Sequence, residues 1–438
     1  MRTRPSLLLC LAFVAAASGR SLTLDEALGT AANRDPQSRS DSLGVESSLL
    51  QASLQRSVWL PSVGVQASYN RLSDISEPPL VLPLPAAVGG PKEVDIAPQI
   101  PNQWGLSARA DQVLWEGGKS IHLERAASLQ AEAGRASRTK SRQDLTTRVA
   151  TAYWNLSAAQ ASLESAKRAL ASADSQAVLT AVGFRQGTAL EQDTLQARLR
   201  MRQIELQVEQ ASASRETARQ ALCVALGLDI REDISASDAL VPLPPPGTPT
   251  AAVERPEIEQ ARAQASSAEE QAKATRAAYS PQIVASAEYD LMDPNPRVVP
   301  NRDSFDGSWR VGVVANWNLF RGGMDDLAAR SADLQARQAR LREVAVRDAD
   351  EQDLALRETD YRLAVRRREI SQSSLPLARR DLELALIRAQ VGTSLRLEAI
   401  DRESALSQAE SDLAQAIAQE NAAALALSLA RGQDPSWK

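Results

Sequence analysis

The sequence has very little histidine and cysteine. Its 438 residues include one histidine, His122, and two cysteines, Cys10 and Cys223. A His-based metal site or a Ser/His/Asp triad is therefore not expected, and two cysteines cannot build a disulfide framework. Gly117-Gly118 is followed by Lys119-Ser120, but Val113 stands where a phosphate-binding loop has its first glycine, and Gly322-Gly323 is followed by Met324-Asp325. We expect no enzyme, no metal and no cofactor.

Strong positive charge and long hydrophobic runs are missing too. The formal net charge is −5, which argues against a nucleic-acid partner. Beyond the N-terminus the longest apolar run, Ala422 to Ala430, is shorter than the roughly 18 residues that a membrane-spanning helix needs. Transmembrane β-strands would escape such a search, because they alternate apolar and polar residues.

The N-terminus has the pattern of a secretory signal. Arg2 and Arg4 precede an apolar run, Leu7 to Ala17, and small residues follow at Ser18-Gly19. This pattern predicts a signal peptide over residues 1–19 that is removed on export. Cys10 lies inside the apolar run, so we interpret it as part of the signal and not as a lipid-attachment site.

The chain repeats itself once. Motifs of the first half return in the second half at a constant offset of 220 residues before the first predicted loop and 205 residues after it. The matched pairs are Asn33–Pro36 with Val253–Pro256, Trp59–Pro61 with Tyr279–Pro281, Leu114–Gly118 with Leu319–Gly323, Gly187-Thr188 with Gly392-Thr393, and Leu226-Gly227 with Arg431-Gly432. Chance similarity between Ala-rich helices would give scattered offsets, so we infer a duplication.

Each half is predicted to run helix, strand, loop, strand, long helix, turn, helix. The predicted boundaries are a first repeat 20–227 with strands about 62–70 and 104–114 and a helical hairpin 118–227, a Pro-rich linker 228–253, a second repeat 254–432 with strands about 282–290 and 308–319 and a hairpin 323–432, and a short tail 433–438. Gly117, Gly118, Gly322 and Gly323 mark the strand-to-helix turns.

The long helices carry heptad patterns. In the first half, apolar residues from Leu145 to Ala177 alternate at spacings of four and three, with Ala on one seam and Leu on the other. In the second half, apolar residues recur every seven positions from Leu356 to Val391. Helices of this length, about 100 Å at 1.5 Å per residue, must pack against other helices along their whole length.

The strands alternate apolar and polar residues. Trp309 and Trp317 lie eight residues apart, about 27 Å along a strand, which suits an apolar band with aromatics at its rims. Tyr69 and Tyr289 lie on the corresponding apolar faces. The alternation breaks at Gln112-Val113, so we expect a bulge or the strand end there. A soluble sheet with one wet face is the alternative. Four strands cannot close a barrel in lipid, whereas three chains would supply twelve.

Together these motifs resemble the outer membrane efflux protein family, the TolC-like channels. The matching pieces are Leu22–Leu28 running to Asp35-Pro36, Leu60-Pro61 before a strand, Leu114–Gly118, Gly187 followed by Asp193, and their second-half copies. The resemblance implies a mainly α fold with a β-barrel contribution, in which a homotrimer forms an α-helical barrel topped by a shared 12-stranded barrel in the outer membrane. It further implies a periplasmic adaptor and an inner-membrane pump or ABC transporter as partners.

The resemblance also assigns site residues. Gly187, Thr188, Gly392 and Thr393 correspond to the periplasmic helix turns where the adaptor docks. Glu398 and Asp401, with Asp193 in the matching place of the first half, correspond to acids at the narrow entrance. A ring of carboxylates attracts cations, although solvated acids on helix surfaces are the plainer interpretation.

Two questions stay open at this point. The alternative is an exported, soluble coiled-coil spacer or adaptor protein. It would have the same signal peptide and heptads, and its strands would form a small docking sheet. The sequence also does not name the cargo, since drug efflux, metal efflux and type I secretion of proteins all use such ducts.

Overall fold

The computed structural model describes residues 20–73, 80–83, 92–94, 100–247, 254–299, 301–391 and 396–433. The predicted signal peptide, the turn residues Gly392 and Thr393, and residues 434–438 of the tail lie outside the described residues. The elements are β1 (Arg20–Leu22), α1 (Leu24–Arg34), α2 (Pro36–Ser57), β2 (Ser62–Arg71), β3 (Leu80–Leu82), β4 (Lys92–Val94), β5 (Asn102–Trp115), α3 (Lys119–Arg185), α4 (Glu191–Leu226), β6 (Ile234–Ala236), α5 (Pro256–Arg276), β7 (Gln282–Asp293), β8 (Asp306–Asn316), α6 (Met324–Val391) and α7 (Arg396–Ala430).

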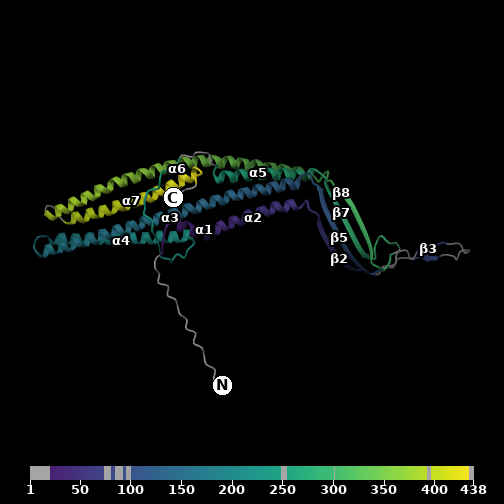
Figure 1. The fold of residues 1–438 in the computed structure, drawn as a ribbon, viewed down its shortest axis with the longest axis horizontal. Coiled ribbons are helices and arrows are strands. Elements are labelled where there is room, and N and C mark those ends of the chain that lie inside the picture. Colours follow the sequence, from purple (N-terminus) through teal and green to yellow (C-terminus); the bar gives the residue numbers. More distant parts are fainter. Residues whose placement is uncertain are drawn as a thin grey trace, which may run out of the picture. The chain divides into compact units, whose positions relative to one another are not determined.

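The chain folds into two compact units, and each takes segments from both halves of the duplication. The first unit comprises Met1–Ser42, Ala136–Glu259 and Ala345–Lys438, and the second comprises Leu43–Arg135 and Gln260–Val344. The order α2-β2-β5-α3-α4 is followed by the equivalent order α5-β7-β8-α6-α7 (Figure 1). The boundaries of the compact units therefore differ from those of the sequence repeats, and each unit contains residues of both repeats.

The second unit contains an antiparallel sheet in the order β2-β5-β7-β8 (Figure 1). Strand β5 of the first half pairs with β7 of the second, so the two repeats join at the middle of the sheet. Strand β8 ends at Asn316, three residues short of the predicted end at 319. Trp317 consequently lies beyond the strand, where its indole N–H donates to the Tyr279 carbonyl at 3.0 Å.

A bulge interrupts β5, as the break in alternation predicts. The register with β7 shifts between Val113 and Trp115. Because one extra residue reverses the side on which the following side chains lie, Trp115 pairs with Ile283 and joins the same face as Ala108 and Ala110. The bulge thus places a tryptophan on the apolar face at the end of the strand.

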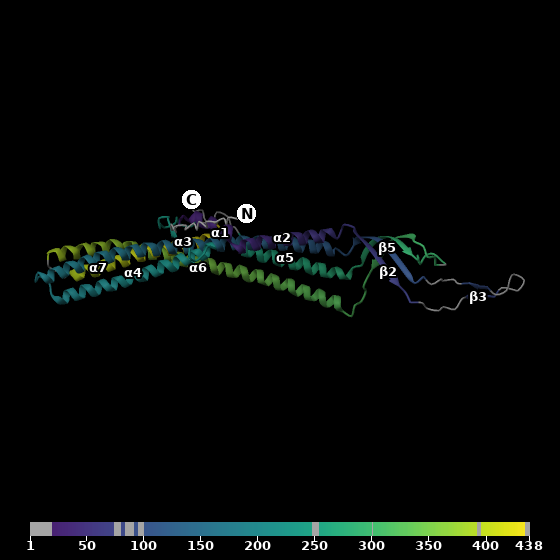
Figure 2. The same cartoon turned by 90° about the horizontal axis from the view of Figure 1, so that it is seen from below.

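In the first unit, α3, α4, α6 and α7 run side by side (Figures 1 and 2). A core of fully buried side chains joins α3 to the end of α4 and to α7, and includes Leu156, Leu222 and Leu425. The first part of the heptad seam predicted on α3 lies in this core, where Val149 and Leu156 are completely buried, and its end at Ala173 and Ala177 lies in a second cluster. Within the described residues, no helix has both the length and the hydropathy needed to cross a membrane.

A short parallel strand pairing completes this core, and no sequence pattern predicts it. Strand β1 pairs with β6, which lies in the predicted linker 228–253. The buried Tyr153 hydroxyl of α3 holds both strands, because it donates to the Leu22 carbonyl at 2.9 Å and accepts from the Asp238 N–H at 3.0 Å. The N-terminal segment and the linker are therefore integral to the first unit.

Candidate functional site

One face of the four-stranded sheet is apolar and exposed. The strand register brings apolar side chains to one face, which includes Val63, Val65, Ala67 and Tyr69 on β2, Trp104, Leu106, Ala108 and Ala110 on β5, Ala287, Tyr289 and Leu291 on β7, and Trp309, Val311 and Val313 on β8. The polar Gln112 and Asp293 lie on this face near its two ends. Val63 is 73% exposed and Trp309 is 70% exposed. An apolar patch that spans four strands is far more than a soluble surface normally presents.

The opposite face is polar. Its side chains include Gly64, Gln66, Ser68 and Asn70 on β2, Ser107 and Arg109 on β5, Ser286, Glu288 and Asp290 on β7, and Ser308, Arg310 and Gly312 on β8. Three neighbouring valines, Val113, Val284 and Val314, lie at the helix-proximal end of this face. Arg109 pairs with Asp111 at 2.8 Å, and Arg310 pairs with Glu288 on the next strand. A sheet with one hydrocarbon-like face and one ionic face is suited to separating lipid from water.

Aromatic side chains lie at both ends of the apolar face. At one end Tyr69 packs on Trp104 with ring centroids 4.4 Å apart. Tyr289 and Trp309 are opposite each other in the register and lie farther in, level with Ala108 of β5. At the other end lies Trp115, 42% exposed. Trp104 and Trp115 were not among the predicted rim residues, although the alternation along β5 and its break at the bulge could have indicated both.

The strand-to-helix turns use glycine where the backbone requires it. Gly117, Gly118, Gly322 and Gly323 all have positive φ, between +64° and +82°. This conformation costs a residue with a Cβ about 1–2 kcal/mol. At Gly117 a Cβ would also approach the Ser280 side chain to 2.6 Å. These pairs let each strand turn directly into its long helix.

The turn between α3 and α4 presents apolar side chains. Gly187 has φ +74°, and the Thr188 N–H donates to the Gly183 carbonyl at 2.8 Å, which closes the end of α3. Phe184 is 44% exposed and Leu190 is 67% exposed beside this turn. The equivalent residues Gly392 and Thr393 lie outside the described residues.

The three candidate acids have different surroundings. Asp193 caps the start of α4, because its carboxylate accepts the Leu190 N–H at 3.0 Å. Asp401 on α7 pairs with Arg200 on α4 at 3.0 Å, and Glu398 pairs with Arg388 on α6 at 3.5 Å. The structure thus brings Glu398 and Asp401 to the start of one helix and leaves Asp193 on another. It also adds two arginines that sequence spacing could not associate with them.

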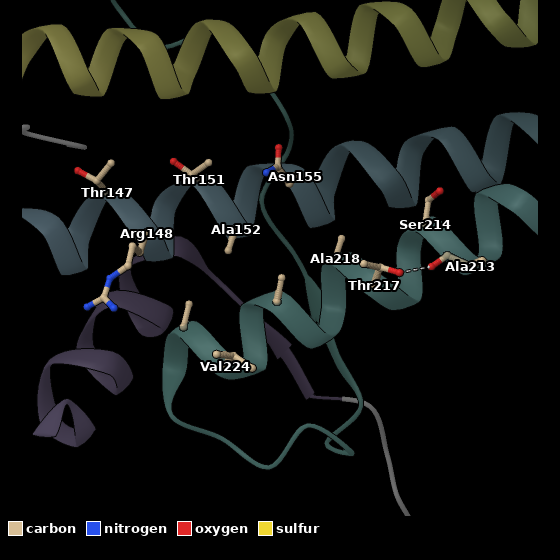
Figure 3. A pocket seen from close by; sticks show the side chains of 12 residues that line it. Thr147, Arg148, Thr151, Ala152, Asn155, Ala213, Ser214, Thr217, Ala218 and Val224 are labelled. Carbon is tan, nitrogen blue, oxygen red and sulfur yellow. Dashed lines mark hydrogen bonds between the residues drawn. The ribbon is translucent and has the colours of Figure 1, made fainter.

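A groove of about 880 Å³ lies between α3 and α4, and small side chains line most of it. Ala152 of α3 and Ala218 of α4 point into it, with Thr151 and Thr217 beside them (Figure 3). The Thr217 hydroxyl donates a hydrogen bond to the Ala213 carbonyl of its own helix at 2.9 Å and therefore does not donate across the groove. The groove is open and mostly apolar.

Helix α6 carries an uncovered apolar stripe. The heptad residues predicted to pack are exposed, at 54% for Leu356, 52% for Leu363, 53% for Ile370, 71% for Leu377, 37% for Leu384 and 71% for Val391. A heptad seam that a helix does not bury within its own chain is the usual mark of packing against another chain.

Comparisons with known proteins agree with these features. The family whose sequence model matches is described as "Outer membrane efflux protein", and the match covers residues 27–228 and 248–433. Among curated proteins, no sequence matches the chain.

Solved structures show the same fold. A membrane protein of Pseudomonas aeruginosa is 20% identical, with a TM-score of 0.76 over 99% of both chains. The CmeC outer membrane channel of Campylobacter jejuni is 17% identical, with a TM-score of 0.76 over 93% of this chain and 85% of that one. The open MtrE outer membrane channel of Neisseria gonorrhoeae is 20% identical, with a TM-score of 0.76 over 94% and 89%. The predicted fold class, mainly helical with a β-barrel contribution, is confirmed.

Proposed function

Since the chain belongs to the outer membrane efflux protein family, we propose that three copies form one passive exit duct through the outer membrane, opened from the periplasm by a docked adaptor. The family favours this channel over the soluble spacer that the sequence alone left open. The observation that carries the proposal is the sheet of one chain, which is apolar on one face, ionic on the other and too small to close.

The sheet needs partners at its edges. Strands β2 and β8 are the outer strands, and within the described residues neither has a second neighbour. An open edge exposes unpaired backbone groups, each of which costs several kcal/mol in hydrocarbon. Pairing β8 of one copy with β2 of the next satisfies both edges, and three copies give an even, twelve-stranded barrel.

The helices need partners as well. The stripe from Leu356 to Val391 offers six large side chains to a neighbour. The groove beside Ala152 and Ala218 offers small residues with room between them. Large side chains that enter spaces between small ones are the geometry of knobs-into-holes packing. We therefore place the α6 stripe of one copy against the α3–α4 face of the next.

The turn at Gly187 supports docking of the adaptor. Phe184 and Leu190 give it an apolar surface on an otherwise polar helix end. Exposed apolar residues at such a site favour association with a hydrophobic groove on a partner. The partners that follow are a periplasmic adaptor protein and, behind it, an inner-membrane pump or ABC transporter that supplies the energy and selects the cargo.

Glu398 and Asp401 support an acidic entrance near the same end of the helices. In this state Arg388 and Arg200 neutralise them. Since the Arg200–Asp401 pair joins α4 to α7, separating these helices would break it and free a carboxylate in each of three copies. Opening therefore increases the cation preference of the entrance.

Recording from purified protein in planar bilayers tests the proposal. The trimer should leave the envelope fraction only with detergent and should form cation-preferring pores of uniform conductance. Protein that is released by buffer alone and forms no pores would overturn the proposal in favour of the soluble spacer.

A further inference from the structure

The contact between α3 and α7 contains two apolar clusters separated by a polar segment. The first cluster includes Leu156 and Ala158 of α3 with Ala414 and Ala418 of α7. The second includes Ala173 and Ala177 of α3, Ile204 of α4 and Ile400 of α7. These clusters cover the two ends of the seam, so whatever lies between them determines how easily the helices part there.

Serines and glutamates occupy the seam between the clusters and the near edge of the second cluster, where Ala169 and Ala173 flank Ser172 along α3. The Ser162 and Ser411 hydroxyls are 2.8 Å apart, Ser165 donates to Glu410 at 2.7 Å, and Ser172 donates to Glu403 at 3.3 Å. The Ser407 hydroxyl lies 3.1 Å from the Ser165 hydroxyl. We name these seven residues the serine–glutamate layer. Replacing apolar packing by such contacts weakens a helix seam, since hydrogen bonds contribute only about 1 kcal/mol each.

The two glutamates of the layer are neutralised to different degrees. Glu410 pairs with Arg168 of α3 at 2.5 Å and with Arg379 of α6 at 3.6 Å. Among the described residues no basic side chain forms an ion pair with Glu403, whose partner is the Ser172 hydroxyl. The charge of Glu410 is therefore balanced by ion pairs, whereas no ion pair balances the charge of Glu403 among the described residues.

The pKa values follow from this difference. Burial raises the pKa of Glu403, and the like charge of Glu410 adds to this effect. Burial acts on Glu410 in the same direction, but the hydrogen bonds from Ser165 and Arg168 outweigh it and lower the pKa of that carboxyl. In the closed seam, Glu403 therefore binds its proton more tightly than an exposed glutamate does.

Other charged groups near Glu403 are already paired. On its own helix Asp401 pairs with Arg200 of α4, and Arg402 pairs with Asp381 of α6. From α3, Arg168 is engaged by Glu410. Gln207 of α4, which contacts Ser404, is neutral. Among the described residues, Arg168 is the basic group whose charge acts on Glu403, and Glu410 already pairs with it.

We propose that the serine–glutamate layer is a proton-sensitive hinge in the seam between α3 and α7, held closed when Glu403 is neutral and loosened when Glu403 is ionised. The idea rests on the proposed function and adds to it a regulator, the periplasmic proton concentration. An ionised Glu403 gains hydration when the helices part, and this gain exceeds the Ser172 hydrogen bond that the carboxylate loses, whereas a neutral Glu403 gains little.

The sign follows from proton linkage. The closed seam binds more protons than the open seam between the ordinary pKa of 4.5 and the raised value. Acid therefore favours closure, and the closed state is lost as the pH rises through the raised pKa. The ion pairs of Glu410 act oppositely, because they support closure above pH 4.5 and are lost below it. Closure should be greatest in mild acid, just above pH 4.5.

Single-channel recording of the full trimer between pH 5 and pH 7.5 tests the hinge. The open probability should rise with pH over this range, because the closed seam gives up its extra proton as the pH passes the raised pKa of Glu403. The variant E403Q keeps a polar side chain without charge and should stay as closed as the unmodified protein is at pH 5. The exposed Glu209 of α4 supplies the control E209Q, which should behave like the unmodified protein.

A second variant separates proton sensing from simple weakening of the seam. E410Q removes the ion pairs with Arg168 and Arg379 and should open the channel more at every pH in this range, while the dependence on pH persists. Pores whose pH dependence is unchanged in E403Q would overturn the hinge alone. Absence of pores from the unmodified protein would overturn the proposed function and the hinge with it.

Discussion

The Arg200 guanidinium of α4 lies 3.0 Å from the Asp401 carboxylate of α7, near the turn-proximal ends of both helices. The two residues are 201 positions apart in the sequence and come from different halves of the duplication. Their ion pair joins the second hairpin helix of the first repeat to the second hairpin helix of the second repeat. In the proposed channel, this contact links closure of the entrance to neutralisation of its charge.

Removing this arginine should open the entrance. Both side chains are nearly half exposed, at 47% and 45%, so the pair contributes only about 0.2–1 kcal/mol. We expect R200Q to raise the open probability roughly 1.4- to 5-fold and to strengthen cation preference in bilayer recordings. The control R202Q loses only the pair with Glu205 on the same helix, so equal effects of the two variants would contradict this role.

A charge in the α6 stripe should prevent assembly. Leu363 is 52% exposed in the single chain, and burying a leucine stabilises an interface by about 1.5–3 kcal/mol. We expect L363E to shift the protein from trimer to monomer in detergent, as measured by light scattering. Exposed Asp360 on the same helix supplies the control D360N, which should stay trimeric.

The two faces of the sheet should respond differently to lysine. On β8, Val311 belongs to the apolar face and Ser308 to the polar face. A lysine at the bilayer midplane costs about 2–4 kcal/mol on a lipid-facing position of a barrel. V311K should therefore fold poorly into lipid vesicles while S308K folds normally. Equal folding yields would show that the assignment of the faces is wrong.

The end of α4 should lose stability in acid through Glu216. Hydrogen bonds from Arg219 and Gln220 lower the pKa of Glu216 to about 2. A lowered pKa stabilises the fold above the ordinary value of 4.5, and this contribution disappears as the pH falls toward 2. Because the carboxylate is about half exposed, E216Q should cost only about 1 kcal/mol at pH 7.

Thermal unfolding in detergent measures this difference. Arg219 is almost fully buried and also donates to the Ile230 carbonyl at 2.8 Å, so Glu216 anchors the segment that follows α4. The melting temperatures of E216Q and the unmodified protein should differ at pH 7 and converge near pH 2. A difference that is constant across pH would exclude the ion pair as its cause.

The long helices and strands could be predicted from the sequence, because their apolar residues recur at the same spacing along the whole element. The alternation on β2 and β7 and the heptads on α3 and α6 extend over many residues, and the duplication supplies each of them twice. Strands β1 and β6 span three residues each. Such short strands have no detectable period. Their pairing is supported by the Tyr153 hydroxyl, which hydrogen-bonds to Leu22 of β1 and to Asp238, two residues after β6.

The candidate site could be predicted only in part. Glu398 and Asp401 follow a recognisable turn, whereas Arg200 and Arg388 lie on other helices and become partners only after folding. The expected end of β8 was wrong because Trp317 looks like one more residue of the alternation. Its bond to the Tyr279 carbonyl, which sequence cannot reveal, holds it outside the strand.

The mass of the detergent-solubilised particle tests the central claim most directly. Native mass spectrometry should give three chains per particle, because one chain leaves two sheet edges and the α6 stripe uncovered. A particle that contains one chain, stable without detergent, would contradict the account.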